Sequence, residues 1–359
     1  MRRKLCALAL TVLLLVLSVC PASADGGWRV LFDDEFYTVP DTTPMVVQDG
    51  VVYFPIDEFL EKFSATYIYE VYSGSLTIFR DKQILTMNIY SGRVVTDDKR
   101  VLYAKTFFTN GTFYVPVEFL CGEFGASFSL LSDGTPRIVT KSTLTNLQFE
   151  LIQSTMTSEN PGSKSEPSVY VSLRELTPAR VSEAMGVLED SGLKGAFFFS
   201  EITIKRYPAT VRRVLARGHT VGLTLSDSQL ARGLSASSVA AAIESANDAY
   251  QKITKQRATL VYIDTGGSFS AQARNRLYQN GYRMWGVNLP LPSSVGGTKA
   301  SSADILTVLG RVRWDICIGV TNSAESVSML DAVLQGGGSY RLRPLTQTAT
   351  PINYQQDIR

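Results

Sequence analysis

Histidine is almost absent from this sequence, because His219 is the only one among 359 residues. Catalytic zinc sites usually hold their metal with imidazoles, and a Ser-His-Asp site needs an imidazole beside its nucleophile. A Gly-x-Ser-x-Gly nucleophile elbow is missing as well. The one histidine follows Gly218 at the end of a predicted helix, where its ring can hydrogen-bond the last helical carbonyls. We therefore predict a structural role for His219.

Cysteine is scarce too, with four residues, of which Cys6 and Cys20 lie within the first 24 positions. Cys121 and Cys317 remain, far apart in the chain and each in an apolar setting. No Cys-x-x-Cys pair or similar zinc spacing occurs. The pattern predicts two separate buried thiols and no disulfide framework.

Charge of either sign is not in excess, since the formal net charge is +2. Arg2, Arg3 and Lys4 precede an apolar run over 5–19 and the small residues Ala-Ser-Ala that end at position 24. This pattern predicts a signal peptide over 1–24 and an exported protein, extracellular or associated with the cell envelope. Only an uncleaved leader would contact a membrane. Loss of its three basic residues leaves a net charge of about −1, which predicts no nucleic-acid partner.

A polar stretch over 154–168 divides the chain, because it holds many serines, two prolines and no aromatic residue. We predict a first domain over 28–146, a linker over 147–167, a second domain over 168–345 and a C-terminal tail over 346–359.

The first half contains an internal repeat. The sequence DGVVYFPIDEFLEKFSA begins at Asp49, and NGTFYVPVEFLCGEFGA begins at Asn110, 61 residues later. In both copies an Asx-Gly turn leads into a strand that ends in Tyr-x-Pro, and a short amphipathic helix follows. This pattern resembles the copper-amine-oxidase N-terminal-like domain, which implies a small α+β module with a structural or envelope-binding role. The name does not imply copper here, because this half has no histidine.

The second half alternates apolar strands with amphipathic helices. The strands are SVYVSL, KGAFFFS, HTVGLTL and ATLVYID, at 168–173, 194–200, 219–225 and 258–264. Apolar strands separated by helices predict a parallel α/β sheet, either open or closed into a barrel.

One long segment of this half, LKGAFFFSEITIKRYPATVRRVLARGHTVGLTLSDS, is similar to the polysaccharide deacetylase family, also called the NodB-homology family. The resemblance extends over about 168–345. It implies a distorted parallel (β/α) barrel that removes acetyl groups from glycans. In that family one aspartate and two histidines hold a metal that activates water, a second aspartate is the general base, and a late histidine is the acid.

The working positions of the family carry other residues here. Arg174 stands at the base position and Glu175 at the metal-aspartate position, while Thr224 and Ser228 replace the two metal histidines. The family's Arg-Pro-Pro-Tyr loop falls near 262–265, and its late Leu-His-Asp falls near 319–321. A protonated arginine cannot accept a proton, and hydroxyls are weak metal ligands. We therefore predict a pseudoenzyme with no catalytic residue, no metal and no other cofactor.

A groove remains, because ligands of parallel α/β folds meet the carboxyl ends of the strands. Aromatic rings and polar groups there would bind sugar, or would simply fill the vacated site. The predicted groove residues are Arg174, Glu175, Thr224, Asp227, Ser228, Tyr262, Asp264 and Trp285.

These patterns predict an exported, non-catalytic protein that binds or scaffolds at the cell envelope, with peptidoglycan or another glycan as its partner. One alternative is a divergent carbohydrate deacetylase or hydrolase that acts on non-peptide C–N bonds through a carboxylate site. Its candidate groups are Glu175, Asp227, Asp264 and Asp315. Another alternative is a protein-interaction subunit of an active envelope enzyme.

Overall fold

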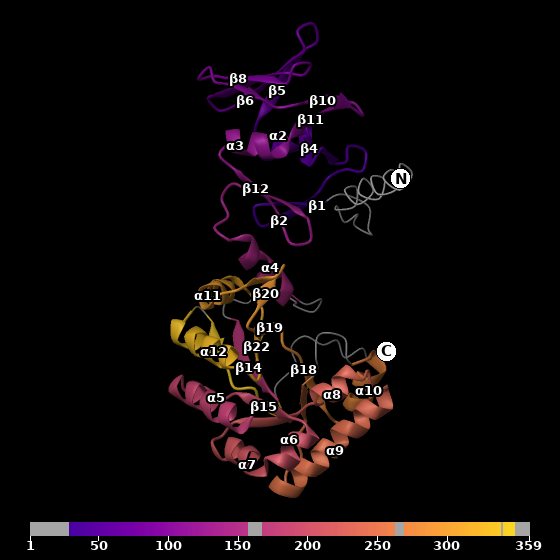
Figure 1. The fold of residues 1–359 in the computed structure, drawn as a ribbon, viewed down its shortest axis with the longest axis vertical. Helices are drawn as coiled ribbons and strands as arrows, with labels where there is room; N and C mark the ends of the chain where they lie inside the picture. The colour runs from indigo at the N-terminus through magenta and orange to yellow at the C-terminus, as the bar shows by residue number, and fades with distance from the viewer. Residues whose placement is uncertain (1–28, 157–166, 263–268, 339, 349–359) are drawn as a thin grey trace, which may run out of the picture. The chain divides into compact units, whose positions relative to one another are not determined.

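The computed structural model describes residues 29–156, 167–262, 269–338 and 340–348 (Figure 1). The chain divides into two compact units between Thr143 and Leu144. The predicted signal peptide and Asp264 lie outside the described residues. No helix within the described part of the chain is long and apolar enough to cross a membrane.

The described residues of the first unit, 29–143, form three small sheets and two short helices, which confirms the predicted α+β class. The sheets have the strand orders β12-β13-β1-β2, β10-β11-β4-β3 and β5-β6-β7-β8-β9. The strands are β1 (Arg29–Phe32), β2 (Glu35–Thr38), β3 (Val46–Gln48), β4 (Val51–Pro55), β5 (Thr66–Glu70), β6 (Ser75–Arg80), β7 (Gln83–Asn88), β8 (Arg93–Thr96), β9 (Val101–Tyr103), β10 (Phe107–Thr109), β11 (Thr112–Pro116), β12 (Ser127–Leu130) and β13 (Pro136–Val139). The helices are α2 (Ile56–Lys62) and α3 (Val117–Glu123).

The internal repeat forms the centre of this unit. Strands β4 and β11, one from each copy, pair antiparallel, with Phe54 opposite Val115. Each strand is entered through its Asx-Gly turn, and both residues of each turn have positive φ, as a type I′ hairpin turn requires. The helices that follow bury Phe59, Phe63 and Phe124, whose rings pack together with centroids 4.6 to 6.3 Å apart. The copies therefore share one core.

The second unit is an α/β sheet with helices. Its strands are β14 (Ser168–Arg174), β15 (Ala196–Phe199), β16 (Thr220–Leu223), β17 (Leu260–Tyr262), β18 (Arg283–Trp285), β19 (Leu289–Leu291), β20 (Ser294–Val295), β21 (Thr298–Lys299), β22 (Ile316–Val320) and β23 (Arg341–Leu342). Its helices are α4 (Asn146–Thr155), α5 (Pro178–Asp190), α6 (Glu201–Arg206), α7 (Pro208–Ala216), α8 (Asp227–Ala231), α9 (Ala236–Thr254), α10 (Ala271–Gln279), α11 (Ser302–Arg311) and α12 (Ala324–Gly336).

The main sheet has the strand order β18-β17-β16-β15-β14-β22-β19, and β23 pairs with the start of β14. All of these pairings are parallel, so the predicted parallel α/β sheet is confirmed. Among the described residues the order ends at β18 and at β19 without a pairing between them. Within the described residues the sheet is therefore a half-barrel, as the predicted distorted parallel barrel implies.

Alternation along the strands separates two apolar clusters. In β14, Val169, Val171 and Leu173 belong to the large cluster that the helices cover. The residues between them face the other way, where Phe198, Trp285 and Cys317 belong to a smaller cluster with Tyr170 and Tyr262 packed against it. Because side chains of a strand alternate in direction, this inner face also receives Arg174, Tyr262 and Trp285, at which β14, β17 and β18 end.

Two predicted boundaries need correction. The linker predicted over 147–167 begins with a helix, α4, because Thr145 caps it with a capping box and Leu151 and Ile152 are buried in the core of the second unit. The predicted tail over 346–359 begins with an anchored residue. Gln347 accepts hydrogen bonds from the backbone N–H groups of Thr259 and Leu260 and donates one to the Val221 carbonyl.

Candidate functional site

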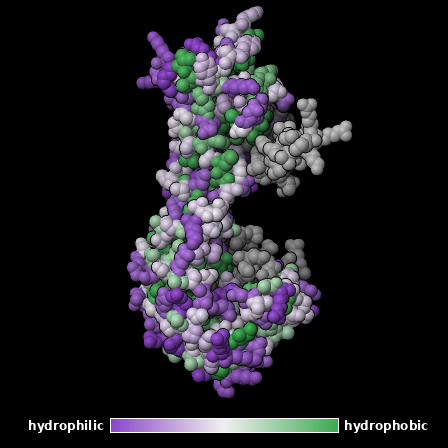
Figure 2. All heavy atoms as spheres, viewed as in Figure 1, coloured by the Kyte–Doolittle hydropathy of each residue, from purple (hydrophilic) through white to green (hydrophobic). Residues whose placement is uncertain are grey.

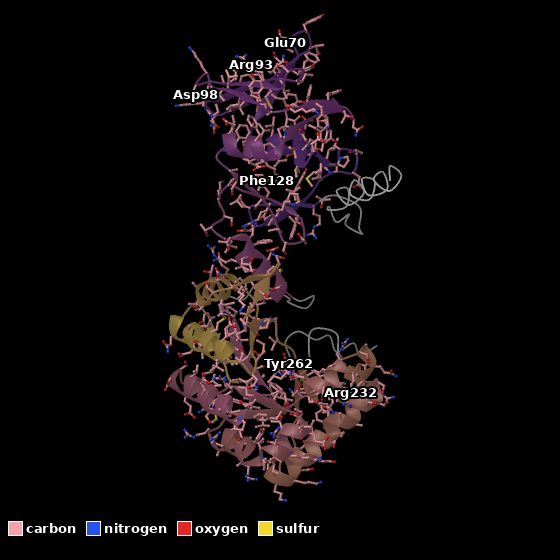
Figure 3. The ribbon with its side chains drawn as sticks, viewed as in Figure 1. Glu70, Arg93, Asp98, Phe128, Arg232 and Tyr262 are labelled. Carbon is pink, nitrogen blue, oxygen red and sulfur yellow. The ribbon has the colours of Figure 1, made fainter. Side chains whose placement is uncertain are left out.

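A pocket of about 270 Å³ opens at the carboxyl ends of the strands of the main sheet. Four of the predicted groove residues line it, namely Arg174, Glu175, Asp227 and Tyr262. Tyr262 is labelled in Figure 3, at the end of β17. The other lining residues are Ser172, Val287, Pro290, Gly319, Val320, Thr321 and Asn322.

Arg174, the last residue of β14, extends its guanidinium across the neighbouring strands of the inner face. Nε donates to Thr224 Oγ1 at 3.3 Å, and Nη2 donates to the Leu225 carbonyl at 3.2 Å. The same Nη2 forms an ion pair with Asp227 Oδ1 at 2.7 Å. The guanidinium carbon also lies 5.7 Å from the Tyr262 ring centroid, a cation–π distance. A fixed positive charge therefore lies at the position where the resemblance predicts a general base.

Glu175 is held as a cap for the next helix. Its carboxylate accepts hydrogen bonds from the Ser200 N–H at 2.5 Å, from Ser200 Oγ at 3.0 Å and from Thr203 Oγ1 at 2.9 Å. Ser200 is the N-cap of α6, so these bonds place a negative charge at the positive end of that helix. Glu175 has φ +54°, and its N–H donates to the Phe198 carbonyl at 3.0 Å. Its carboxylate is therefore committed to the protein's own donors.

Thr224 and Ser228, at the two metal-histidine positions, hydrogen-bond within the protein. The buried Thr224 hydroxyl accepts from Arg174 and donates to the Leu225 carbonyl at 3.3 Å. The Ser228 hydroxyl lies 3.1 Å from Ser226 Oγ, the N-cap of α8. Neither residue lines the pocket. Both belong to local structure at the end of β16.

Trp285 was predicted in the groove, and the structure contradicts this. The side chain is fully buried in the inner cluster, where its ring centroid lies 5.2 Å from that of Tyr170. Trp285 ends β18 beside Tyr262 of β17 and faces the inside as expected, but its side chain is fully buried and does not line the pocket. It fills the half-barrel and is not available to a ligand.

Asn322, two residues after the end of β22, lines the pocket and was not among the predicted groove residues. Its Oδ1 accepts hydrogen bonds from the Thr177 N–H at 3.1 Å and from Thr177 Oγ1 at 3.3 Å. The signal was available, because a polar residue that follows a parallel strand is placed at the ligand-binding edge. Pro290 and Val287 also line the pocket. Nothing in their local sequence distinguishes them from core residues.

Two other candidates lie at the opposite ends of their strands. Asp315 precedes β22, and its Oδ1 accepts the Ser168 N–H at 2.8 Å, so the prediction that it lies near the site is wrong. His219 precedes β16 and is buried, with Nδ1 accepting the Gly195 N–H at 3.2 Å and Nε2 3.9 Å from Glu189. Burial lowers the pKa of His219, and the charge of Lys194 lowers it further. The predicted structural role fits these contacts.

The predicted buried thiols are also found where the sequence analysis expected them. Cys121 and Cys317 are buried and unbridged, and burial raises the pKa of each thiol to about 12. Neither is a reactive thiolate at neutral pH.

The residues do not fit the metal that the family resemblance implies. A divalent cation bound to Thr224 Oγ1 would lie close to the positively charged Arg174 guanidinium, because Arg174 Nε is 3.3 Å from that oxygen. It would also compete with three hydrogen bonds for the Glu175 carboxylate. Within the described ranges, no group of three or more His, Cys, Asp or Glu side chains is arranged to hold a metal ion.

Comparison with known proteins identifies two family matches in this chain. The polysaccharide deacetylase family matches residues 162–285, and the copper amine oxidase N-terminal domain matches residues 32–138. Both resemblances expected from the sequence are thereby confirmed. No curated protein matches the chain significantly.

Several solved structures resemble part of this chain. The polysaccharide deacetylase Bc1974 from Bacillus cereus is 16% identical, with a TM-score of 0.44, and the match covers 54% of this chain and 98% of that one. Peptidoglycan deacetylase PdaC from Bacillus subtilis is 20% identical, with a TM-score of 0.40 and coverage of 52% and 89%. BA3943 from Bacillus anthracis, a CE4 family pseudoenzyme, is 13% identical, with a TM-score of 0.41 and coverage of 50% and 64%.

Proposed function

We propose that this protein is an exported, non-catalytic relative of the polysaccharide deacetylases that binds glycan at the cell envelope. The observation that carries the proposal is the pairing of Arg174 with Thr224 and Asp227 in the pocket. Deacetylation requires a metal to polarise the acetyl carbonyl and a base to take a proton from water. A guanidinium does neither, because it repels a cation and holds its protons throughout the accessible pH range.

The rival function, a deacetylase with a carboxylate-only site, is disfavoured by the surroundings of its candidate groups. Glu175 accepts three hydrogen bonds, Asp227 is paired with Arg174, and Asp315 lies at the other end of its strand. Oxygen-only sites suit Ca²⁺ or Mg²⁺, which acidify a bound water much less than zinc does. A subunit that only partners another protein lacks a specific supporting observation.

Activity and metal content test the non-catalytic part of the proposal. The protein is incubated with chitotetraose and with zinc or cobalt, and released acetate and bound metal are measured. We expect no acetate above the no-protein level and less than one equivalent of metal. Stoichiometric zinc together with acetate release that Glu175→Ala abolishes would establish the deacetylase instead.

A matched variant controls that experiment. Arg174→Asp, Glu175→Asp, Thr224→His and Ser228→His together restore the residue types that the family has at these positions. We expect this variant to retain zinc through dialysis, because three of the four changes supply ligands and the fourth removes a competing positive charge. If the variant binds zinc and the natural sequence does not, these four side chains account for the absence of zinc binding.

Binding to purified peptidoglycan tests the second part. The protein is mixed with insoluble peptidoglycan and centrifuged at several salt concentrations. Recovery in the pellet is expected at moderate salt. Recovery in the supernatant under all conditions would contradict the glycan-binding function while leaving the absence of catalysis intact.

A further inference from the structure

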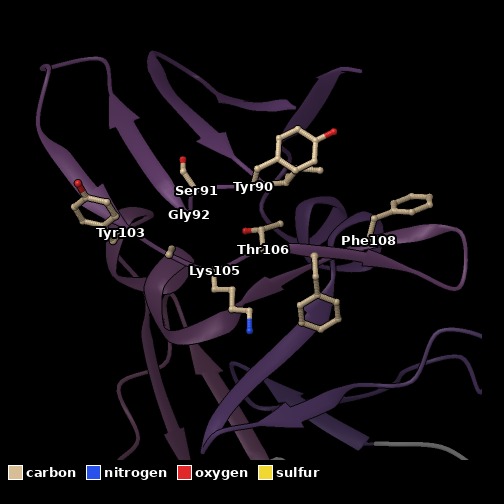
Figure 4. Close-up of a pocket in the computed structure, with 10 residues that line it drawn as sticks. Tyr90, Ser91, Gly92, Tyr103, Lys105, Thr106 and Phe108 are labelled. Carbon is tan, nitrogen blue, oxygen red and sulfur yellow. The ribbon is translucent and has the colours of Figure 1, made fainter. Parts of the chain in front are cut away.

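The first unit has a groove of its own, of about 670 Å³ (Figure 4). Its walls are the turn between β7 and β8, the end of β9 and strand β10. This volume is within the range of small-ligand sites. The lining residues are Ile89, Tyr90, Ser91, Gly92, Tyr103, Ala104, Lys105, Thr106, Phe107 and Phe108.

Three aromatic rings of this groove are open to solvent. Tyr90 and Tyr103 are each 74% exposed, and Phe108 is 57% exposed. Figure 4 shows the three rings spread along the pocket, with Lys105 and Thr106 between Tyr103 and Phe108. Large aromatic side chains are usually buried, and an exposed group of them marks a binding surface. Hydrophobic residues appear among the polar ones on the surface of this unit (Figure 2).

The groove is held in shape before any ligand binds. The Tyr90 ring lies directly over Gly74, where an added Cβ would come within 2.2 Å of the ring. Asn88 joins the two neighbouring turns, since its amide donates to the Ser73 carbonyl and its Oδ1 accepts from the Ser91 N–H, each at 2.9 Å. A rigid surface loses little conformational entropy on binding.

The floor is rigid as well. Phe107 stacks on the buried Tyr114 with centroids 5.3 Å apart and planes 7° apart, and Tyr53 packs on it at 5.0 Å. Ring contacts of this kind fix Phe107 in one rotamer. Phe107 is therefore held by two aromatic neighbours, Tyr53 and Tyr114.

The charged side chain that lines the groove is positive. Lys105 is the only charged lining residue, and no ion pair to it is found within the described residues. Arg93, labelled in Figure 3, stands directly across from Tyr103 on the neighbouring strand and adds a second positive charge at the rim. A ligand with a carboxylate complements this charge better than a neutral one.

We propose that this groove binds an acidic glycan, with sugar rings stacked on Tyr90 and Tyr103 and a sugar carboxylate near Lys105. Tyrosine suits this ligand because its ring packs against the C–H face of a sugar while its hydroxyl bonds sugar hydroxyls. This inference rests on the proposed function, which supplies the glycan, and it assigns the binding to the first unit instead of the deacetylase-like pocket.

Two soluble probes of equal length test the proposal by calorimetry. One is the tetrasaccharide of alternating N-acetylglucosamine and N-acetylmuramic acid, and the other is chitotetraose, which lacks the lactyl carboxylates. We expect the acidic probe to bind about tenfold more tightly. Tyr103→Ala and Tyr90→Ala should each weaken both probes by about tenfold, because each removes a stacking surface. Lys105→Gln should abolish the preference and leave chitotetraose binding unchanged.

Control variants separate this proposal from the general function. Tyr72→Ala removes a fully exposed ring outside the groove and should change nothing. Tyr262→Ala, in the pocket of the second unit, should also bind both probes normally. The groove proposal is overturned if the Tyr90 and Tyr103 variants bind the probes as well as the natural sequence does, or if only Tyr262→Ala loses binding. Either result keeps the glycan-binding function.

If the natural sequence binds neither the probes nor peptidoglycan, the groove proposal and the glycan-binding function are both contradicted. Thermal melting of each variant verifies its fold.

Discussion

At the scale of single residues, Glu175 is a helix cap at the position where the family resemblance predicts a metal ligand. The carboxylate caps α6 through three hydrogen bonds, and the backbone at this position is left-handed, with φ +54°. A non-glycine residue in this conformation persists only where neighbouring contacts determine it. The hydrogen bonds supply that determination.

Replacing Glu175→Gln tests this role. The amide NH₂ group of glutamine is a donor and would face the donors of Ser200 and Thr203, so hydrogen bonds would be lost. We therefore expect the free energy of unfolding, measured by urea denaturation, to fall by about 2 kcal/mol. Glu183→Gln is the matched control, because Glu183 forms an exposed ion pair with Arg180 on α5. Its effect should stay within about 0.5 kcal/mol. Equal effects of the two changes would refute the capping role.

His219 predicts a pH dependence of stability. Burial lowers its pKa below the ordinary value of 6.5, so the folded protein binds fewer protons than the unfolded chain. The stability is complete above about pH 6.5 and is lost as the pH falls toward the folded-state pKa, by at most about 1.4 kcal/mol per pH unit. Urea denaturation at pH 7.5, 6.5 and 5.5 measures the loss. His219→Gln should flatten this slope, and an unchanged slope would assign it to other groups.

The family resemblance and the rule that ligands meet the carboxyl ends of parallel strands predicted the groove residues from the sequence. Arg174 and Tyr262 end parallel strands, and both line the pocket. The same reasoning failed for Trp285, because a position at the end of a strand does not determine the depth at which a ring is buried. The role of Glu175 also escaped prediction, since its partners Ser200 and Thr203 come from another element.

At the scale of elements, the inner face of the half-barrel depends on glycine. A Cβ added at Gly222 in β16 would come within 2.4 Å of the Phe198 ring and 3.1 Å of the Leu260 carbonyl. One added at Gly319 in β22 would meet Val287 at 2.5 Å. These positions leave room for the large rings that fill the inside of the sheet.

The variant Gly222→Ala is therefore expected to lower the free energy of unfolding by about 1–3 kcal/mol, through overpacking against Phe198. Gly186→Ala is the counterpart in helix α5, where an added Cβ has nothing within 4 Å. Because alanine is the better helix former, this change should stabilise by about 0.5–1 kcal/mol. Urea denaturation of both variants gives the comparison. A stabilising Gly222→Ala would mean that the inner face is not tightly packed.

At the scale of the whole molecule, each of the two units has hydrophobic packing of its own. One core lies within the first unit and includes Leu76 and Tyr114's neighbours Val115 and Phe113, while two clusters lie within the second. A unit with its own core is expected to fold by itself. The aromatic groove and the deacetylase-like pocket thus belong to different units, each of which we expect to be stable by itself.

A fragment of residues 29–143 tests this independence. We expect it to unfold cooperatively in urea and to keep the affinity of the whole protein for the acidic tetrasaccharide. Fluorescence and calorimetry measure the two properties. A fragment without a cooperative transition would show that the first unit needs the rest of the chain.

The sequence alone determined the local properties of this protein: two halves, a repeat, the α/β alternation and the scarcity of histidine. These follow from composition and short-range periodicity, which need no knowledge of distant contacts. The tertiary structure decided that Arg174 pairs with Asp227, that Trp285 is buried, and that Tyr90, Tyr103 and Lys105 share one groove. Such arrangements depend on contacts between residues far apart in the chain, and sheet pairing and packing set those contacts only when the whole unit has folded.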